Sequence, residues 1–207
     1  MASRAITVFL LAVGLVTIAG CQKGARTHSA PSINASSAGS GAIAQYDANK
    51  DGKINGAELD TAPALKAALA QIDKDKDGAI TAEEISTRIK EWQESKWTVA
   101  TINIVVQRNG KPLTDADVKL VPEKFLGDNL VAATGKTDRS GKVSPSVPLT
   151  QPGDLPGLAP GLYRMEVTKA GANIPAKYNT ESTLGVEIAA DAPWAIGMAK
   201  ELRVNLK

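Results

Sequence analysis

The chain has 207 residues, with 24 Lys and Arg against 22 Asp and Glu, so its formal net charge is only +2. The basic residues are spread along the sequence, which leaves nucleic-acid binding without a basic patch. A single cysteine excludes an intramolecular disulfide, so the fold is held together without a covalent cross-link of this kind. With one cysteine and one histidine there is no candidate nucleophile and base pair, and the sequence predicts a protein that is not an enzyme.

Residues 1–20 are typical of a bacterial export signal. They contain the basic Arg4, an apolar run over residues 6–18 and small residues before Cys21, and the run is too short to span a membrane. The segment Ile18-Ala19-Gly20-Cys21 resembles the lipobox of bacterial lipoproteins, which implies that Cys21 carries a lipid such as palmitate and anchors the chain to a membrane. Gln22, in place of an aspartate, then points to the outer membrane, on its periplasmic or cell-surface face. The alternative is an ordinary secretory signal followed by a stray cysteine.

Residues 21–40 are rich in Ser, Ala and Gly and offer little to bury, so they are predicted to form a flexible tether. The only histidine, His28, lies in this range. A catalytic or metal-binding imidazole needs a scaffold to orient it, so no role is expected for His28.

Two stretches of twelve residues, 47–58 and 73–84, both fit the spacing D-x-[DN]-x-[DN]-G-x5-E. A hard cation such as calcium needs about six to eight oxygen ligands, which a short segment can supply only by wrapping around the ion. The first loop would supply Asp47, Asn49, Asp51, the carbonyl of Lys53, Asn55 directly or through water, and Glu58. The second would supply Asp73, Asp75, Asp77, the carbonyl of Ala79, Thr81 and Glu84.

On these motifs the chain resembles the EF-hand family in its paired form, over residues 41–96, and the resemblance implies two calcium ions. Gly52 and Gly78 allow the sharp turn that the loop needs. Ile54 and Ile80 suit a short antiparallel contact that joins the loops. The second loop has four carboxylates and the first has three and an amide, so the second is expected to bind calcium more tightly.

The helices around the loops are predicted from apolar spacing. Residues 41–46 form the entering helix, and the segment 59–72 is too short for two full helices and a linker, so the middle helices should be abbreviated. Ile85, Ile89 and Trp92 form one stripe on the exiting helix. The stripe is either the core of the pair or a groove for a partner.

From Trp97 the apolar pattern alternates, which indicates a second domain over residues 97–207. The fold class is therefore α+β with two domains, a small all-α EF-hand pair followed by an antiparallel β-sandwich. The strands are expected at 98–107, 116–121, 130–136, 142–147, 162–169, 184–189 and 201–206.

The turn-bearing segments 109–113, 116–120, 137–141 and 160–164 resemble the carboxypeptidase regulatory-like, or transthyretin-like (prealbumin-like), sandwich of exported bacterial proteins. Segments 174–179 and 183–187 are similar to a form found in lipoproteins of planctomycete-like bacteria. The resemblance implies an accessory or adhesive module without shared catalytic residues.

Two functions follow from these patterns. The first is a calcium-binding, membrane-anchored lipoprotein whose sandwich binds a glycan or protein, with residues 125–126 and 155–158 as apolar contacts unless they are buried anchors. The alternative is a calcium-responsive regulatory subunit that exposes a partner surface near Trp92 and Trp97.

Overall fold

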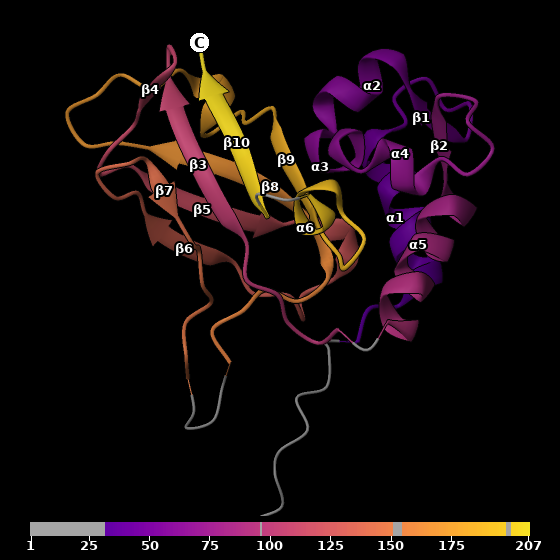
Figure 1. Cartoon of the computed structure of the whole chain (residues 1–207). Coiled ribbons are helices and arrows are strands. Elements are labelled where there is room, and N and C mark those ends of the chain that lie inside the picture. Colours follow the sequence, from indigo (N-terminus) through magenta and orange to yellow (C-terminus); the bar gives the residue numbers. More distant parts are fainter. Residues whose placement is uncertain (1–31, 96, 151–154, 198–199) are drawn as a thin grey trace, which may run out of the picture.

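The computed structural model describes residues 32–95, 97–150, 155–197 and 200–207. The expected signal, Cys21 and His28 lie outside these ranges, as does most of the expected tether. The described residues form a helical part and a β-rich part that lie side by side (Figure 1). Among them, no helix is both long enough and apolar enough to cross a membrane.

The helical part contains two short strands and five helices. Its elements are α1 (Ala35–Tyr46), β1 (Lys53–Asn55), α2 (Gly56–Thr61), α3 (Pro63–Ala67), α4 (Leu69–Ile72), β2 (Ala79–Thr81) and α5 (Ala82–Glu94). The three middle helices have 6, 5 and 4 residues, which agrees with the expectation that this segment is abbreviated. Pro63 begins α3, where its missing N–H costs nothing.

The first helix begins earlier than the sequence predicts. Asn34 caps α1 by accepting a hydrogen bond from the Ser37 amide at 2.9 Å, so residues 35–40 are helical and the assignment of this stretch to a flexible tether is wrong. The helix buries Ala38, Gly39 and Ala42. A Cβ at Gly39 would overlap the main chain of α5, so the two helices approach closely through small residues. Small residues give no apolar stripe, which is why the pattern does not reveal them.

The β-rich part consists of two sheets. One has the order β10 (Glu201–Leu206), β3 (Asn103–Arg108) and β4 (Lys111–Pro112), with β7 (Lys142–Val143) also paired to β3. The other has the order β6 (Ala133–Lys136), β5 (Asp117–Pro122), β8 (Gly161–Thr168) and β9 (Leu184–Ile188). Three short helices complete this part: η1 (Lys124–Leu126), η2 (Ala176–Tyr178) and α6 (Pro193–Ile196).

The second sheet is antiparallel throughout, as expected, and the first departs from expectation in one pairing. β10 runs parallel to β3, in register from Glu201 with Asn103 to Leu206 with Arg108. Parallel neighbours need a long crossover. All the strands of the second sheet lie between β3 and β10 in the sequence. This long connection allows β10 to run in the same direction as β3. A transthyretin-like topology stays a prediction.

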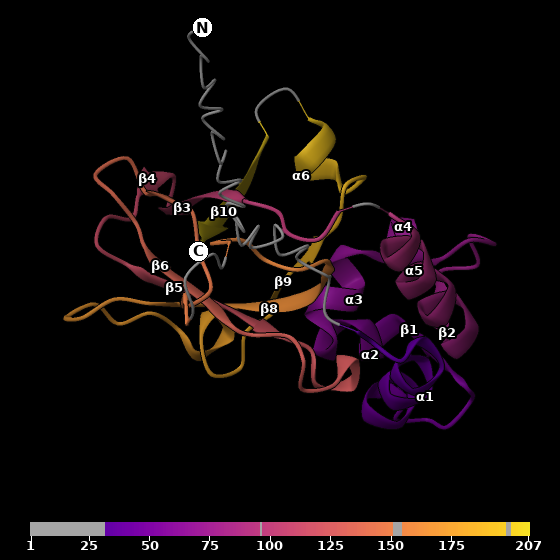
Figure 2. The same cartoon turned by 90° about the horizontal axis from the view of Figure 1, so that it is seen from below.

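The helical and β-rich parts share one core. Phe125, Leu126 and Leu162 belong to the same buried cluster as the apolar side chains of α3, α4 and α5. The α3 helix lies against β8 and β9 (Figure 2). At Gly185 on β9 there is no room for a Cβ beside the Pro63 main chain. The boundary near residue 96 therefore separates two sequence patterns but not two independently packed bodies.

The apolar loop residues divide between the two alternatives left open by the sequence. Phe125 and Leu126 are 9% and 2% exposed, and the Phe125 ring meets the edge of Tyr46 with the ring centroids 6.3 Å apart. Leu158 is fully buried, whereas Leu155 is 45% exposed. The first three are thus packing anchors, whereas Leu155 and Pro156 are exposed and accessible to a partner.

Candidate metal centre

The two twelve-residue loops follow the same backbone path. Lys50 and Lys76, at the fourth position, both have φ of 62°, and Gly52 and Gly78, at the sixth, have φ of 84° and 82°. A left-handed conformation is strained for residues with a side chain, and glycine adopts it freely. The repeated glycine spacing therefore encodes one turn geometry twice.

The loops are joined back to back by β1 and β2. These strands pair antiparallel, with Ile54 opposite Ile80, and both isoleucines are fully buried. The predicted contact between the two isoleucines is confirmed. It fixes the position of one loop relative to the other.

Three carboxylates of the second loop converge. Asp73, Asp75 and Glu84 each offer an oxygen, and the three atoms lie within 4.8 Å of one another. Asp73 is 8% exposed; its Oδ2 accepts a hydrogen bond from the Gly78 amide at 2.9 Å, but its Oδ1 is buried without a hydrogen-bond partner. A buried carboxylate oxygen without a partner is costly unless a cation neutralises it. The donor set, all oxygen and strongly anionic, fits calcium.

Glu84 is held in place by the start of α5. Its Oε2 accepts from the amide and the hydroxyl of Thr81 at 2.9 and 2.8 Å, and its Oε1 accepts from the Lys74 amide at 3.0 Å. The Thr81 hydroxyl in turn accepts from the Glu84 amide, which completes a capping box. The last predicted ligand of the loop is therefore also a helix-capping residue, and its carboxylate is aimed by α5.

The carboxylates of the first loop are occupied by backbone donors. Glu58 Oε1 accepts from the amides of Ala48 and Asn49 at 2.9 and 3.1 Å, and Asp47 Oδ2 accepts from the Gly52 amide at 2.9 Å. The hydrogen bond from the Asn49 side chain lowers the pKa of Asp51. In the part of the chain that the structure describes, only the second loop gathers three acidic groups this closely.

A lysine of the first loop contacts a predicted ligand of the second, and the ligand spacing alone does not predict this contact. Lys53 Nζ lies 2.6 Å from Asp77 Oδ2, while Asp77 Oδ1 accepts from the Ala79 amide at 2.8 Å. The hydrogen bond between them raises the pKa of Lys53 and lowers that of Asp77. The signal was present in the sequence: once Ile54 is paired with Ile80, Lys53 must lie beside the second loop. Lys53 thus neutralises an oxygen that the second loop would offer to calcium.

We expect Lys53→Met to increase the calcium affinity of the second loop by about twofold to fivefold, because an exposed charge pair of this kind contributes only weakly. Calorimetry on a chain that also carries Glu58→Gln, in which the first loop is disabled, measures this. Lys66→Met is the matched control, since Lys66 Nζ lies 2.6 Å from Asp60 Oδ1 outside both loops. Unchanged or weaker calcium affinity in Lys53→Met would contradict the idea that Lys53 competes with calcium for Asp77.

A family model described as EF hand matches residues 41–61 and 65–90. The region that spans these two matched stretches is thus an EF-hand pair. The two matched stretches include both loops in full, and an EF-hand region indicates calcium binding. A search of curated proteins and a search of solved structures found no match for the chain.

Proposed function

We propose that the protein is a membrane-anchored exported lipoprotein whose EF-hand pair binds two calcium ions and whose β-rich part is a non-catalytic accessory or adhesive module. The observation that carries the calcium assignment is the buried, unpartnered Oδ1 of Asp73 among the carboxylates of an EF-hand loop. The ligands of the two ions are those expected from the sequence: Asp47, Asn49, Asp51, Lys53, Asn55 and Glu58 for one, and Asp73, Asp75, Asp77, Ala79, Thr81 and Glu84 for the other.

The role that we propose for calcium is structural. The helices of the pair belong to a core that includes residues of η1 and β8, and Trp92 on α5 is only 5% exposed. Opening a hydrophobic groove would have to break this core. Outside the cytosol calcium is abundant, so sites with dissociation constants of about 10⁻⁴ to 10⁻³ M stay filled.

A calcium titration tests this function against a sensor. We expect calcium to raise the free energy of unfolding, by about 2.7 kcal/mol per site when free calcium reaches about a hundred times the dissociation constant. The measurement is the melting temperature with calcium, with magnesium and with chelator, together with binding of a dye for exposed apolar surface. Stabilisation near millimolar calcium without added dye binding supports the structural role. A large rise in dye binding at micromolar calcium supports the alternative, a regulatory subunit with a partner surface near Trp97, which is 39% exposed.

The membrane anchor rests on the residues around Cys21, which resemble a lipobox. We expect Cys21→Ser to move the protein from the membrane fraction to the soluble fraction, because a stable anchor needs the lipid. Fractionation of bacterial cells that produce each form, with labelling by a palmitate analogue, measures this. Gln22→Asn is a suitable control, since it leaves the cysteine in place. Membrane association that is unchanged in Cys21→Ser contradicts the lipid anchor.

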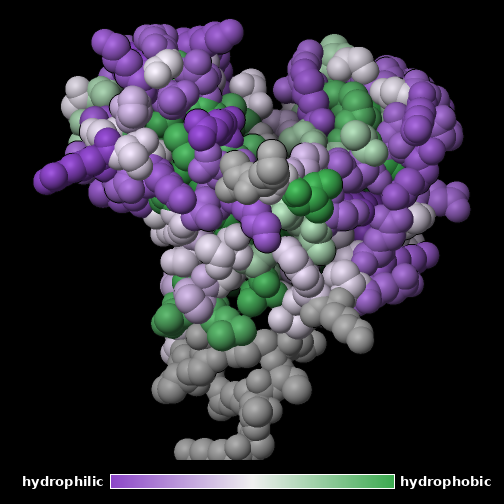
Figure 3. All heavy atoms as spheres, in the orientation of Figure 1, coloured by the Kyte–Doolittle hydropathy of each residue, from purple (hydrophilic) through white to green (hydrophobic). Residues whose placement is uncertain are grey.

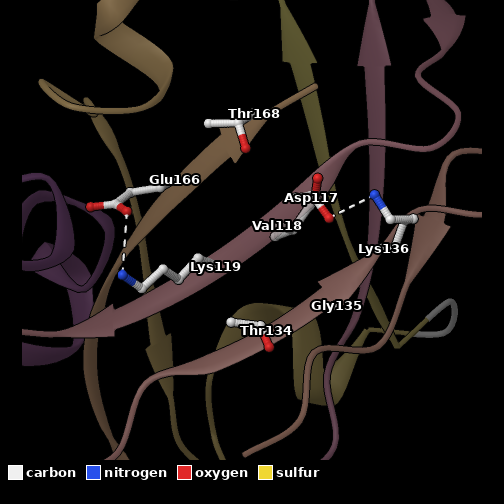
Figure 4. Close-up of a pocket in the computed structure, with 8 residues that line it drawn as sticks. All are labelled: Asp117, Val118, Lys119, Thr134, Gly135, Lys136, Glu166 and Thr168. Atoms are coloured by element: carbon white, nitrogen blue, oxygen red, sulfur yellow. Dashed lines mark ion pairs between the residues drawn. The ribbon is translucent and has the colours of Figure 1, made fainter. Parts of the chain in front are cut away.

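Two surfaces of the β-rich part could take the proposed glycan or protein ligand. One is a hollow of about 420 Å³ on the face of β5, β6 and β8, where Asp117 pairs with Lys136 at 2.7 Å and Thr134 and Thr168 add hydroxyls (Figure 4). These hydroxyl and charged groups would hydrogen-bond the hydroxyls of a glycan, and the apolar atoms between them would contact the faces of its sugar rings. The two acidic groups drawn there each face a lysine, Asp117 with Lys136 and Glu166 with Lys119.

The other surface is apolar. Hydrophobic side chains gather at the lower end of the β-rich part, far from the calcium loops (Figure 3). Separately, Val131 and Leu149 are each 56% exposed. This surface suits a protein. Capture of glycans and of proteins by the purified chain, with calcium or chelator, distinguishes the two surfaces.

A further inference from the structure

A buried arginine joins the exiting EF-hand helix to the β-rich part. The Arg88 side chain on α5 is 4% exposed, and its Nε lies 2.6 Å from Glu187 Oε1 on β9. Its two terminal nitrogens donate to the two oxygens of Asp191 at 2.9 and 2.7 Å. Bidentate pairs of this kind fix orientation as well as distance. Burial opposes the charge on Arg88, but these partners outweigh it and raise the pKa of Arg88.

Glu187 is the centre of this contact. Its side chain is 3% exposed, and its Oε1 also accepts from Trp92 Nε1 at 2.9 Å, while its backbone carbonyl accepts from Trp194 Nε1 at 2.7 Å. Its Oε2 is buried without a hydrogen-bond partner, and burial raises the pKa of Glu187. A buried carboxylate of this kind depends on its guanidinium partner, because loss of either leaves an uncompensated charge.

The same arginine is connected to the second calcium loop. Arg88 Nη1 lies 2.9 Å from Glu91 Oε2, and Glu91 Oε1 lies 2.8 Å from Lys74 Nζ. Lys74 is in the second loop, directly after Asp73, and its amide donates to Glu84 Oε1. A continuous series of charged contacts therefore runs from the loop to β9. Within the described residues, no ion pair connects the first loop to β9.

We propose that Glu187 and Arg88 are positioning residues of the second calcium loop, so that the β-rich part sets the calcium affinity of that loop. This inference rests on the second calcium site of the proposed function. Glu84 and Arg88 lie one turn apart on α5, so clamping Arg88 onto β9 holds the Glu84 carboxylate where the ion needs it. Ligands that are held in place before binding lose less freedom when the ion arrives.

The coupling acts in both directions. If the β-rich part tightens calcium binding, calcium in the second loop must by linkage strengthen the docking of α5 on β9. The β-rich part would then be fastened to the EF-hand pair in calcium and loosened without it. The indole of Trp92, which donates to Glu187, reports this docking directly.

The test is calorimetry on the full chain with Glu58→Gln, in which only the second loop can bind. Adding Glu187→Gln, which keeps the shape and an acceptor oxygen, is expected to weaken calcium binding by about fivefold to twentyfold, within the usual range of coupling between sites. Adding Arg88→Gln should do the same. In a chain with Glu84→Gln, where only the first loop can bind, Glu187→Gln is expected to change affinity less than about twofold by the same reasoning.

Glu166→Gln on β8 is the matched control, because it makes the same charge change outside the series of contacts, and it should alter neither affinity. A second readout is the NMR resonance of the Trp92 indole N–H, which should shift as calcium is added to the Glu58→Gln chain and stay in place in the Glu84→Gln chain. If calcium affinity falls equally at both loops, or is unchanged in both Glu187→Gln and Arg88→Gln, the positioning role is wrong but the second calcium site still stands. No calcium binding by the Glu58→Gln chain overturns the proposed second site as well.

Discussion

Replacing Glu84 by Gln is expected to lower calcium affinity at the second loop by about a hundredfold, or about 2.7 kcal/mol. The substitution removes one of the three converging negative charges and one of two carboxylate oxygens, and calcium affinity depends on the number of charged ligands. Gln can still complete the capping box with Thr81, so α5 is expected to stay folded. Calorimetry should then count one ion fewer per molecule, with the far-ultraviolet circular dichroism unchanged.

The control for Glu84→Gln is its neighbour. Glu83→Gln removes the same charge from the same first turn of α5, but Glu83 is exposed and is not a predicted ligand. It should leave both stoichiometry and affinity nearly unchanged. Glu58→Gln is expected to remove the other ion. If Glu58→Gln and Glu84→Gln both bind as many ions as the unaltered chain, the assignment of the two sites is wrong.

Gly185→Ala is expected to lower the free energy of unfolding by about 3 kcal/mol, the upper part of the range for overpacking a core. The added Cβ would overlap the carbonyl of Pro63 and the amide of Ala64. These are backbone atoms, so the overlap can be relieved only by moving α3 away from β9. Urea unfolding measures the loss, and calcium binding should weaken along with docking.

Gly197→Ala is the matched control for this substitution. The nearest atom to a Cβ at Gly197 is Pro193 O at 3.2 Å, and its φ of −66° is ordinary for alanine. It requires a shift of only a few tenths of an ångström at Pro193 O, so it should lower the free energy of unfolding much less than Gly185→Ala does. Equal unfolding free energies for Gly185→Ala and the unaltered chain would mean that the close approach of α3 and β9 does not stabilise the fold.

The calcium loops could be found from the sequence because their geometry is local. The predicted ligands of each loop lie within twelve consecutive residues, and the glycine at the sixth position sets the turn whatever the rest of the chain does. Most strands of the β-rich part were also found from alternation. Which strands pair with one another was harder to predict. The pairing of β10 with β3 brings together residues about a hundred positions apart, and alternation carries no information on strand direction.

The contacts of small and charged residues could not be found in the same way. Residues 35–40 look like a tether because they have little to bury, and only the close approach of α5 shows that small size is what the helix pair requires there. Arg88 and Glu187 each look like solvated surface residues in the sequence. Their pairing across 99 positions depends on how α5 docks on β9.

By itself, the amino-acid sequence determined that this protein carries two calcium-type loops and a following β-rich part, because ligand spacing and side-chain alternation act over a few residues. Only the tertiary structure decided that these parts share one core and that Asp73 keeps a buried oxygen without a partner. It also brought Lys53 into an ion pair with Asp77, and Arg88 into an ion pair with Glu187. The physical reason is that burial and charge pairing depend on which distant segments meet, and no local pattern records that.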